Sequence, residues 1–493
     1  MTGVIATATS APRAEQLPVH QVVRFVGGRG LAELGDQFLL FAIPLLVYKT
    51  TGSASVTGLV FLIEWLPRVL YLPVAGVLAD RLGGYRLYLG ADCVCATLAL
   101  VAFVLVQLWP SGVVVTLSVL AAAMSLASAQ AYVAMETTLP RFVPADQMVR
   151  AQSTIQGTEQ ASSVLGPALA AMVSAVLATS DLLLLTSGLF ALTAVNVFSL
   201  RVRLRTEVTE AVPTTVRSVI AGIAEGMATL RGLPAILGLV GLTMTVNLMV
   251  GVGVATSAAI TSGTFAKPDH YFGALSTTAG VFSLVTFFLV PRLSRRVTSL
   301  TAIMGSYVII CLGGLTVSQA STFTQFAVGY ALLVGTVGVL NVFIRTERIR
   351  RIPRESLGKT IGLIILLNQI SLPLAGFLVA VFAGANGPQM VVLGSVAGSV
   401  LLALLLLPLV IKLRYPHAHS DSAPNSERAH PIRGRHRSPR ARGDLRRHRG
   451  TDGHPSPGPA MHPHPASRPW RHRRRGARRR GRPAQAGSGG RAL

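Results

Sequence analysis

Five ionisable residues stand at helical spacing inside two long apolar stretches near the start of the chain. Arg29, Glu33 and Asp36 are four and three residues apart, so one face of a helix carries all three. Glu64 and Arg68 are four apart in the next stretch. Ionisable side chains deep in a bilayer are costly and mark functional sites. We expect a carboxylate beside an arginine there to gain and lose a proton; a static ion-pair network is the alternative.

Depth and position make Asp36 the favoured proton-binding residue of this group. It lies about 21 Å from the inner end of its helix, at about 1.5 Å per residue, which is at or beyond mid-membrane. The apolar stretches of the second half of the chain contain no Asp or Glu. If protons drive the protein, the sequence therefore places their binding site in the first half.

A second set of polar residues predicts a watery cavity. A polar stripe at helical spacing faces water more readily than lipid, and the second half offers isolated amides. The predicted cavity residues are Gln156, Glu159, Gln160, Asn247, Asn341 and Asn368. The alternative for the amides is hydrogen bonding between helices. A cavity with this mostly apolar lining suits an amphipathic small molecule.

The elements that must position these residues are membrane helices. Hydrophobic residues make up 51% of the 493-residue chain and charged residues 13%, against about 25% charged residues in soluble domains. Each apolar stretch has about the 20 residues needed to cross a bilayer. Twelve stretches are predicted to do so: 22–48, 56–79, 87–109, 112–135, 152–178, 182–200, 234–262, 271–290, 299–319, 322–344, 360–383 and 388–411.

The twelve predicted helices fall into two similar halves. The phrase "LPRFVPADQMVR" at 139–150 is repeated as "IRRIPRESLGK" at 349–359, which indicates a duplicated unit. We expect Pro144 and Pro353 at the first position of a helix, with Asp146 and Glu355 in its first turn. This is either a capped loop or a gating element.

Five segments follow from this pattern. An N-terminal segment covers 1–20, the first six-helix bundle 21–200, a cytoplasmic linker 201–233, the second six-helix bundle 234–411 and a basic tail 412–493. Within the linker, residues 216–230 are expected to form an amphipathic helix on the inner membrane surface.

Basic residues predict the orientation. Nearly all arginines of the membrane region lie in loops after even-numbered helices, and the loops after odd-numbered helices hold only Lys49 and Lys267. By the positive-inside rule both termini are cytoplasmic, and we expect a multi-pass protein of the plasma (inner) membrane. The first stretch contains Glu33 and Asp36 and lacks a small-residue cleavage site, so it is expected to remain in the mature protein.

The three cysteines indicate packing rather than metal binding or disulfides. Cys93 and Cys95 are two apart and point to different faces of a helix, and Cys311 stands alone in another. No metal and no cofactor are expected, and the sequence lacks a Walker-type loop for nucleotide.

Residues 412–493 carry most of the chain's formal net charge of +25 and are rich in Arg, Pro, Gly and His. Such a composition forms no apolar core. One interpretation is binding to anionic lipid or nucleic acid. The favoured one is an out-of-frame extension with no transport role, so no nucleic-acid partner is expected.

One loop gives the most specific resemblance. "GVLADRLGGYR", from Gly76 to Arg86, resembles the loop signature of the major facilitator superfamily. We expect Gly76 and Gly83 to let helices approach closely, and Asp80 to meet a helix end or an arginine. The resemblance implies that Asp80, Arg81 and Arg86 form a latch between the halves on the inner side.

Other stretches are similar to the drug and siderophore exporter branch of that superfamily, which includes macrolide-efflux and enterobactin-exporter proteins. They are "LAELGDQFLLFAIPLLVYKTTGSASVTGL" in the first helix and following loop, and "VPADQMVRAQ" before the fifth helix. "GPALAA", beginning at Gly166 and Pro167, resembles the superfamily's proton-antiporter motif, with Ala170 and Ala171 where glycines are expected.

The sequence thus predicts an all-α membrane protein with twelve helices in two bundles. We expect a monomeric secondary transporter, not an enzyme, that exports an amphipathic drug, siderophore or secondary metabolite by alternating access in exchange for protons. An importer of a small solute is one alternative. A membrane sensor or scaffold that moves nothing is another.

Overall fold

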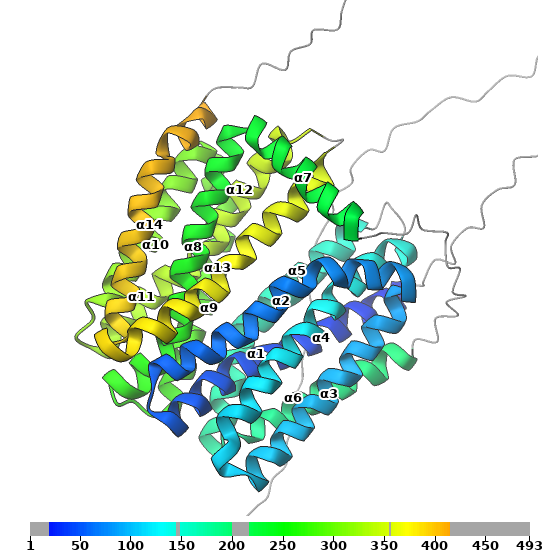
Figure 1. The fold of residues 1–493 in the computed structure, drawn as a ribbon, viewed down its shortest axis with the longest axis vertical. Helices are drawn as coiled ribbons and strands as arrows, with labels where there is room; N and C mark the ends of the chain where they lie inside the picture. The colour runs from blue at the N-terminus through cyan, green and yellow to red at the C-terminus, as the bar shows by residue number, and fades with distance from the viewer. Residues whose placement is uncertain (1–18, 144–147, 200–215, 354–355, 415–493) are drawn as a thin grey trace, which may run out of the picture. The chain divides into compact units, whose positions relative to one another are not determined.

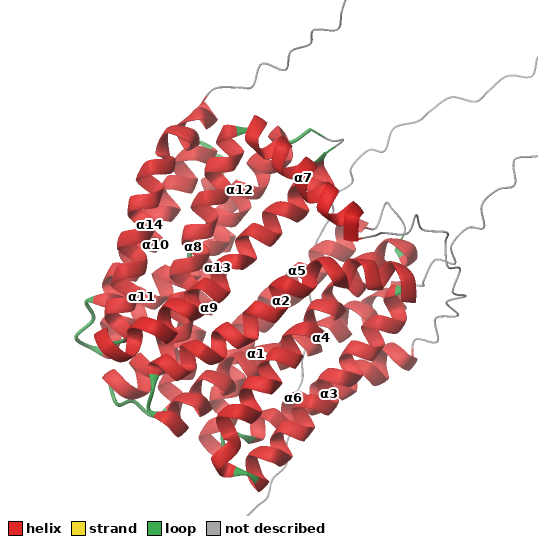
Figure 2. Cartoon of the chain, viewed as in Figure 1, coloured by secondary structure: helices red, strands yellow, loops and turns green. Residues whose placement is uncertain are grey.

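The computed structural model of the protein describes residues 19–143, 148–199, 216–353 and 356–414. Throughout these ranges the regular secondary structure is helical (Figures 1 and 2). Long apolar runs produce this because a helix satisfies every backbone hydrogen bond within one segment.

The first half of the chain forms six long helices. They are α1 (Val19–Thr51), α2 (Ala54–Leu82), α3 (Gly84–Leu108), α4 (Val113–Phe142), α5 (Met148–Val176) and α6 (Asp181–Ser199). Helix α1 packs against α5 and α6, and α4 packs against α2 and α3. Because α1 touches most of the other helices in this half, its polar residues are held within the bundle.

The second half forms the matching set. Its helices are α8 (Pro234–Ala258), α9 (Asp269–Leu293), α10 (Ser299–Ser318), α11 (Phe323–Gly335), α12 (Val337–Arg351), α13 (Leu357–Asn386) and α14 (Pro388–Ile411). A π-helical turn at Ala259–Thr264 continues α8. Helices α11 and α12, separated at Thr336, together make one span from Phe323 to Arg351.

Eleven helical segments in the described ranges are long and apolar enough to cross a membrane. Helix α5, which carries the predicted polar stripe, has 29 residues and is the twelfth long segment. Six long segments before the linker and six after it confirm the predicted twelve-helix, all-α membrane fold. The tenth span, predicted to end at residue 344, continues to Arg351 and so includes the buried Glu347.

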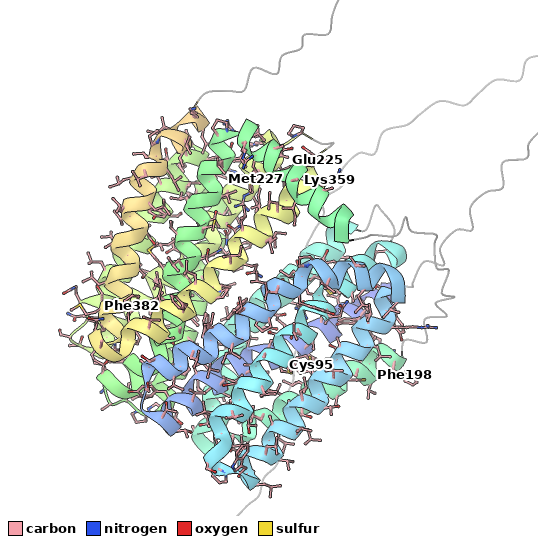
Figure 3. All side chains as sticks on the ribbon, viewed as in Figure 1. Cys95, Phe198, Glu225, Met227, Lys359 and Phe382 are labelled. Atoms are coloured by element: carbon pink, nitrogen blue, oxygen red, sulfur yellow. The ribbon has the colours of Figure 1, made fainter. Side chains whose placement is uncertain are left out.

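Helix α7 (Val216–Gly232) lies in the linker, where an amphipathic helix is expected. Leu230 is buried, and the Glu225 carboxylate forms an ion pair with Lys359 of α13 at 2.5 Å (Figure 3). The carbonyl oxygen of Lys359 also lies against Gly226. Helix α7 is therefore attached to the first turn of α13.

Two glycines near the end of α2 have roles that differ from the prediction. A Cβ added at Gly76 would meet nothing within 4 Å, so no neighbouring helix approaches closely at this residue. Gly83 has a φ of 86° and alone separates α2 from α3. It serves a sharp turn, because glycine adopts positive φ without a steric penalty.

The repeated phrase also differs in detail from the prediction. Helix α12 ends at Arg351 and α13 begins at Leu357, so Pro353 lies in the connection and not at the first position of the helix. Ser356 directly precedes α13. Pro144, Asp146 and Glu355 lie outside the described residues.

The two halves meet at close helix crossings. A Cβ added at Gly376 of α13 would lie 2.6 Å from the backbone nitrogen of Leu62 and 2.9 Å from the carbonyl oxygen of Gly58, both in α2. Gly273 of α9 is pressed in the same way against Ala171 of α5. Both crossings lie toward the end of the helices where α1 turns into α2. The predicted orientation would make this the outer end and the conformation inward-facing, and this assignment stays a prediction.

Candidate functional site

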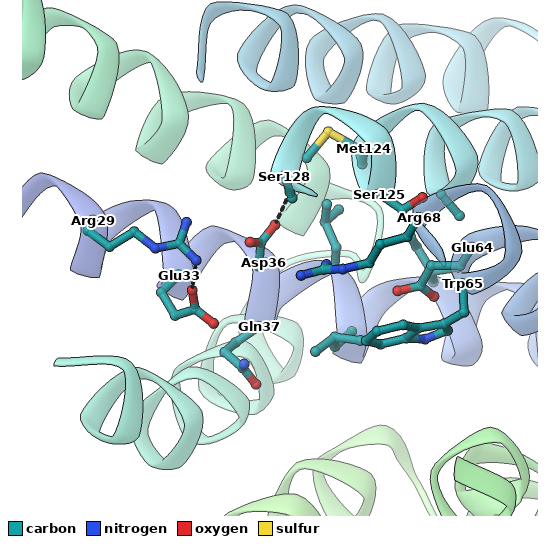
Figure 4. A pocket seen from close by; sticks show the side chains of 14 residues that line it. Arg29, Glu33, Asp36, Gln37, Glu64, Trp65, Arg68, Met124, Ser125 and Ser128 are labelled. Carbon is teal, nitrogen blue, oxygen red and sulfur yellow. Dashed lines mark hydrogen bonds and ion pairs between the residues drawn. The ribbon is translucent and has the colours of Figure 1, made fainter. Parts of the chain in front are cut away.

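A cavity of about 260 Å³ lies among α1, α2 and α4 (Figure 4). All five residues of the predicted ionisable cluster line it. Its polar lining consists of Arg29, Glu33, Asp36, Gln37, Glu64, Trp65, Arg68, Ser125 and Ser128. Apolar walls come from Leu39, Leu40, Ile43, Ala121 and Met124. The lining thus combines charged groups with an apolar surface large enough to hold part of a small molecule.

Arg29 and Glu33 form an ion pair along α1. An Nη2 hydrogen of Arg29 is donated to Oε2 of Glu33 at 2.6 Å, across one helical turn. The Arg29 side chain is 7% exposed and that of Glu33 is 19% exposed. The Nε–H of Arg29 is buried and has no hydrogen-bond acceptor in the described part of the chain. Arg29 therefore keeps one donor available for another acid.

Asp36 is hydrogen-bonded to a residue of a second helix, α4. Its Oδ1 accepts a hydrogen bond from the Ser128 hydroxyl of α4 at 3.1 Å, and Figure 4 shows the two side chains meeting at the cavity wall. Asp36 lies near the middle of α1, as the depth argument requires. The serine orients the carboxyl group without neutralising its charge, so Asp36 can still exchange a proton.

On α2, Arg68 is held by an aromatic ring. Its Cζ lies 5.3 Å from the ring centroid of Trp65, within range of a cation–π interaction. The Nε–H of Arg68 and the indole N–H of Trp65 are both buried without an acceptor in the described residues. Glu64 shares the cavity with them and lies within the electrostatic reach of Arg68. The cavity wall thus contains two buried donors that no acceptor satisfies among the described residues.

The α5 stripe is described only in part. Glu159 is partly buried, and the charges of Arg29 and Glu33 act on it. The structure thus brings Glu159 close to the α1 cluster. The side chains of Gln156 and Gln160 lie outside the described residues.

The predicted second-half amides do not line this cavity. The side-chain amide of Asn247 in α8 donates to the backbone oxygen of Asn368 in α13 at 3.3 Å. Oδ1 of Asn368 is buried with no donor among the described residues, and Asn341 is partly buried in α12. Their arrangement fits contact between helices at Asn247, and a role in substrate binding stays a prediction.

Two side chains of the loop signature are missing from the described part of the chain. Arg86 is exposed on α3, whereas the side chains of Asp80 and Arg81 lie outside the described residues. The predicted latch therefore stays a prediction.

The antiporter-like motif lies where α5 crosses its neighbours. Gly166 packs directly against the side chain of Gln37 on α1, and the carbonyl oxygen of Pro167 lies against Gly273 of α9. Ala170 and Ala171 are buried, and Ala171 also contacts Gly273. Close packing survives the replacement of glycine by alanine, because here the partner helix supplies the small residue.

Two buried residues of α3 escaped the sequence analysis. Asp92 and Tyr88 are each 0% exposed, and their side-chain oxygens have no hydrogen-bond partner in the described part of the chain. Asp92 is an acid within the predicted span 87–109, so the rule that selected Asp36 would also have selected it.

The described part of the second half also contains two acids that the predicted spans excluded. Asp269 is the first residue of α9, and Glu347 is buried in α12 with its Oε2 3.1 Å from Nε of Arg351. Both were missed because the observed helices begin earlier or end later than the apolar runs. Glu347 is an acid fixed by its arginine, unlike those of the cavity.

The cysteines are free thiols. Cys93 is exposed and Cys95 is buried, so the two do point to different faces of α3. Among the described residues, no group of three His, Cys, Asp or Glu side chains is arranged to hold a metal ion.

Comparison with known proteins places this fold and cavity in context. The family model described as Major Facilitator Superfamily matches residues 26–374. Macrolide efflux protein A of Streptococcus pyogenes is 27% identical over 154 residues, which are 30% of this chain and 36% of that protein. The chain therefore matches about a third of the length of this relative.

Solved transporter structures share the fold. The inward-facing structure of a bacterial homologue of the iron transporter ferroportin has a TM-score of 0.64 at 19% identity, and the match covers 80% of this chain and 100% of that one. The nucleoside transporter NupG has a TM-score of 0.61 at 12% identity, covering 81% and 100%. At such identities the likeness establishes the fold alone. Together with the family match over more than two thirds of the sequence, it shows that this chain is a membrane transporter belonging to the Major Facilitator Superfamily.

Proposed function

We propose that this transporter exports an amphipathic small molecule in exchange for protons. The observation that carries the proposal is the cavity in which three carboxylates, Glu33, Asp36 and Glu64, face apolar walls. The similarity to a macrolide efflux protein supports export and an amphipathic substrate, since that relative is named for such a compound.

The cavity chemistry suggests how exchange works. An amphipathic cation places its apolar body against Leu40, Ile43 and Met124, and its charge beside Asp36 or Glu64. A proton and a cation compete for the same carboxylate, because each neutralises it. Substrate binding on the inner side thus releases a proton, and protonation on the outer side releases the substrate.

The two arginines of the cavity tune this competition. Arg29 already engages Glu33, and the ring of Trp65 holds Arg68 beside Glu64. These cations keep the empty cavity from accumulating negative charge, which would be costly away from water. Of the three acids, Asp36 makes a hydrogen bond to a neutral hydroxyl, so it is the strongest candidate for proton exchange.

Transport in inside-out membrane vesicles tests movement, direction and coupling together. The probe is a tritiated macrolide, and the lumen is made acidic by an imposed pH gradient. We expect accumulation that stops when nigericin collapses the gradient. Asp181→Asn, which removes a carboxylate that does not line the cavity, is the matched control and should accumulate the probe normally.

Two other functions predict different results. An importer would deplete the vesicles or would accumulate the probe only when the gradient is reversed. A sensor would bind the macrolide in detergent without accumulating it in vesicles under either gradient. Either result would overturn proton-driven export.

A further inference from the structure

Asp92 occupies an unusual position for a carboxyl group. It lies on α3 with 0% exposure, and neither of its oxygens has a hydrogen-bond partner among the described residues. Tyr88, one turn earlier on the same helix, has a buried hydroxyl that also lacks a partner there. Asp92 does not line the cavity, so water in the cavity does not reach it directly.

The surroundings of Asp92 connect it to the cavity cluster. The charged groups that act on it are Arg29 and Asp36 of α1. The charges of both aspartates also act on Cys95, on the next turn of α3, and so does the Ser128 hydroxyl that binds Asp36. Both acids therefore act on one small group of side chains.

The helices packed on α3 supply no competing charge to Asp92. Helices α4 and α6 both pack against it. On α6, Ser187 donates to the carbonyl oxygen of Ala96, one turn along α3 from Asp92. In the described residues, the charge balance at Asp92 therefore depends on Arg29 and Asp36 alone.

An ionised carboxylate without donors is expensive in a dry interior, whereas a protonated one is tolerated. A carboxyl group in the position of Asp92 is therefore expected to be protonated in this conformation, with no hydrogen bond from the described residues to hold the proton in place. The buried Nε–H of Arg29, which has no acceptor in the described structure, is a donor available to stabilise the anion when that proton leaves.

We propose that Asp92 is a second, occluded proton-carrying residue that exchanges its proton with Asp36 during the transport cycle. The O–H bond of Asp92 breaks as an O–H bond forms on the Asp36 carboxylate, and the negative charge moves from Asp36 to Asp92 beside Arg29. This inference rests on the proposed proton exchange. It adds a second proton to each cycle, because Asp36 releases its own proton before it accepts that of Asp92 and then releases the second proton as well.

Infrared spectroscopy tests the protonation of Asp92 without requiring transport. The protein is labelled with ¹³C at the aspartate carboxyl group, reconstituted in lipid and titrated with pH. In Asp36→Asn protein we expect a protonated-aspartate C=O band that persists at neutral pH and shifts with the label. Adding Asp92→Asn to this variant should remove the band. Adding Glu225→Gln, at an exposed position, should leave the band unchanged.

The Asp36→Asn sample keeps the test decisive even if Asp92→Asn does not fold. If labelled Asp36→Asn protein shows no protonated-aspartate band at neutral pH, Asp92 is ionised and the proposal is wrong. A band that survives in folded Asp92→Asn would overturn it equally, because another aspartate would then be its source.

The accumulation ratio at equilibrium tests the second proton. Losing one exchanged proton lowers the limiting ratio by about tenfold per pH unit of gradient, because one pH unit corresponds to about 1.4 kcal/mol. We expect this loss in Asp92→Asn, with macrolide binding retained. An unchanged ratio would overturn the role of Asp92 while leaving proton-driven export intact. Absence of gradient dependence in the wild type would instead overturn the proposed function, and the infrared result would still decide whether Asp92 is protonated.

Discussion

Lys49 at the end of α1 and Asp269 at the start of α9 form an ion pair that joins the two halves of the transporter. The Thr179 hydroxyl, in the turn between α5 and α6, donates to the same Asp269 oxygen at 3.1 Å. Lys49 is one of only two basic residues predicted on the outer side. The pair therefore closes the end at which the halves also cross closely, and it must break when that end opens.

Removing this pair should favour opening of the outer end. The side chains are 46% and 20% exposed, so the interaction contributes about 0.2–1 kcal/mol, or up to about fivefold in the balance of the two conformations. In a cysteine-free background with Ile43→Cys in the cavity, Asp269→Asn should increase labelling by an impermeant maleimide added outside whole cells. The exchange Lys49→Asp with Asp269→Lys should restore the original rate.

Asp181→Asn is the control for this experiment. Asp181 lies at the same end, but its carboxylate accepts a hydrogen bond only from the nearby backbone of Ala178 among its described contacts. The substitution Asp181→Asn should therefore leave maleimide labelling unchanged. Equal labelling of Asp269→Asn and wild type would show that the ion pair does not hold this end closed.

A single methyl group at the α2–α13 crossing should have a larger effect. Gly376→Ala places a Cβ against the backbone of Gly58 and Leu62, which cannot move aside as a side chain can. Overpacking of this kind costs about 1–3 kcal/mol. We expect the inward-facing state to lose population by at least about fivefold.

Gly362→Ala on the same helix is the matched control, because a Cβ there would meet nothing within 4 Å. Spin labels at Leu59→Cys and Phe382→Cys, on the exposed faces of α2 and α13, report the separation of the helices. Gly376→Ala should lengthen the distance and Gly362→Ala should not. Identical distance distributions in the two variants would contradict the proposed role of this crossing.

The fold was largely predictable from sequence because each apolar run has the length of a membrane span. Errors arose where a helix carries charge beyond its apolar run. Helix α12 continues to Arg351 because Glu347 pairs with Arg350 and Arg351, which allows a charged turn to stay packed. Periodicity alone does not reveal such compensation.

The cavity was predictable only in its α1 and α2 part. Helical spacing places Arg29, Glu33 and Asp36 on one face, and the structure confirms that they lie together. Ser128 of α4 comes from a distant part of the chain, so local spacing gives no sign of its bond to Asp36. Gly76 shows a different limit. A glycine in a motif does not reveal whether a neighbouring helix approaches it, and a Cβ added at Gly76 would meet nothing within 4 Å.

Trp65 should report binding by its fluorescence, because it lines the cavity while Trp109 lies exposed at a helix end. A variant that keeps only Trp65, made by Trp109→Phe and Trp470→Phe, should change its emission when amphipathic compounds including a macrolide are added. A variant that keeps only Trp109 should not respond. A response from Trp109 alone would place binding outside the described cavity.

Substitution of the three cavity acids tests proton coupling most directly. Asp36→Asn keeps the size of the side chain and its hydrogen bonding to Ser128, but it cannot carry a proton. We expect it to abolish macrolide accumulation driven by a pH gradient while exchange of labelled for unlabelled macrolide, which needs no energy, continues. Coupling should therefore fail before folding does.

Glu33→Gln and Glu64→Gln are the parallel variants. Glu33 already pairs with Arg29 at 2.6 Å, so its loss frees a buried arginine and should impair stability more than coupling. Glu64 shares its part of the cavity with Arg68, and its substitution should weaken macrolide binding and coupling together. If all three variants retain full gradient-driven accumulation, the cluster is a structural ion-pair network. The driving ion would then have to bind elsewhere, because no other group of acids lines the described cavity.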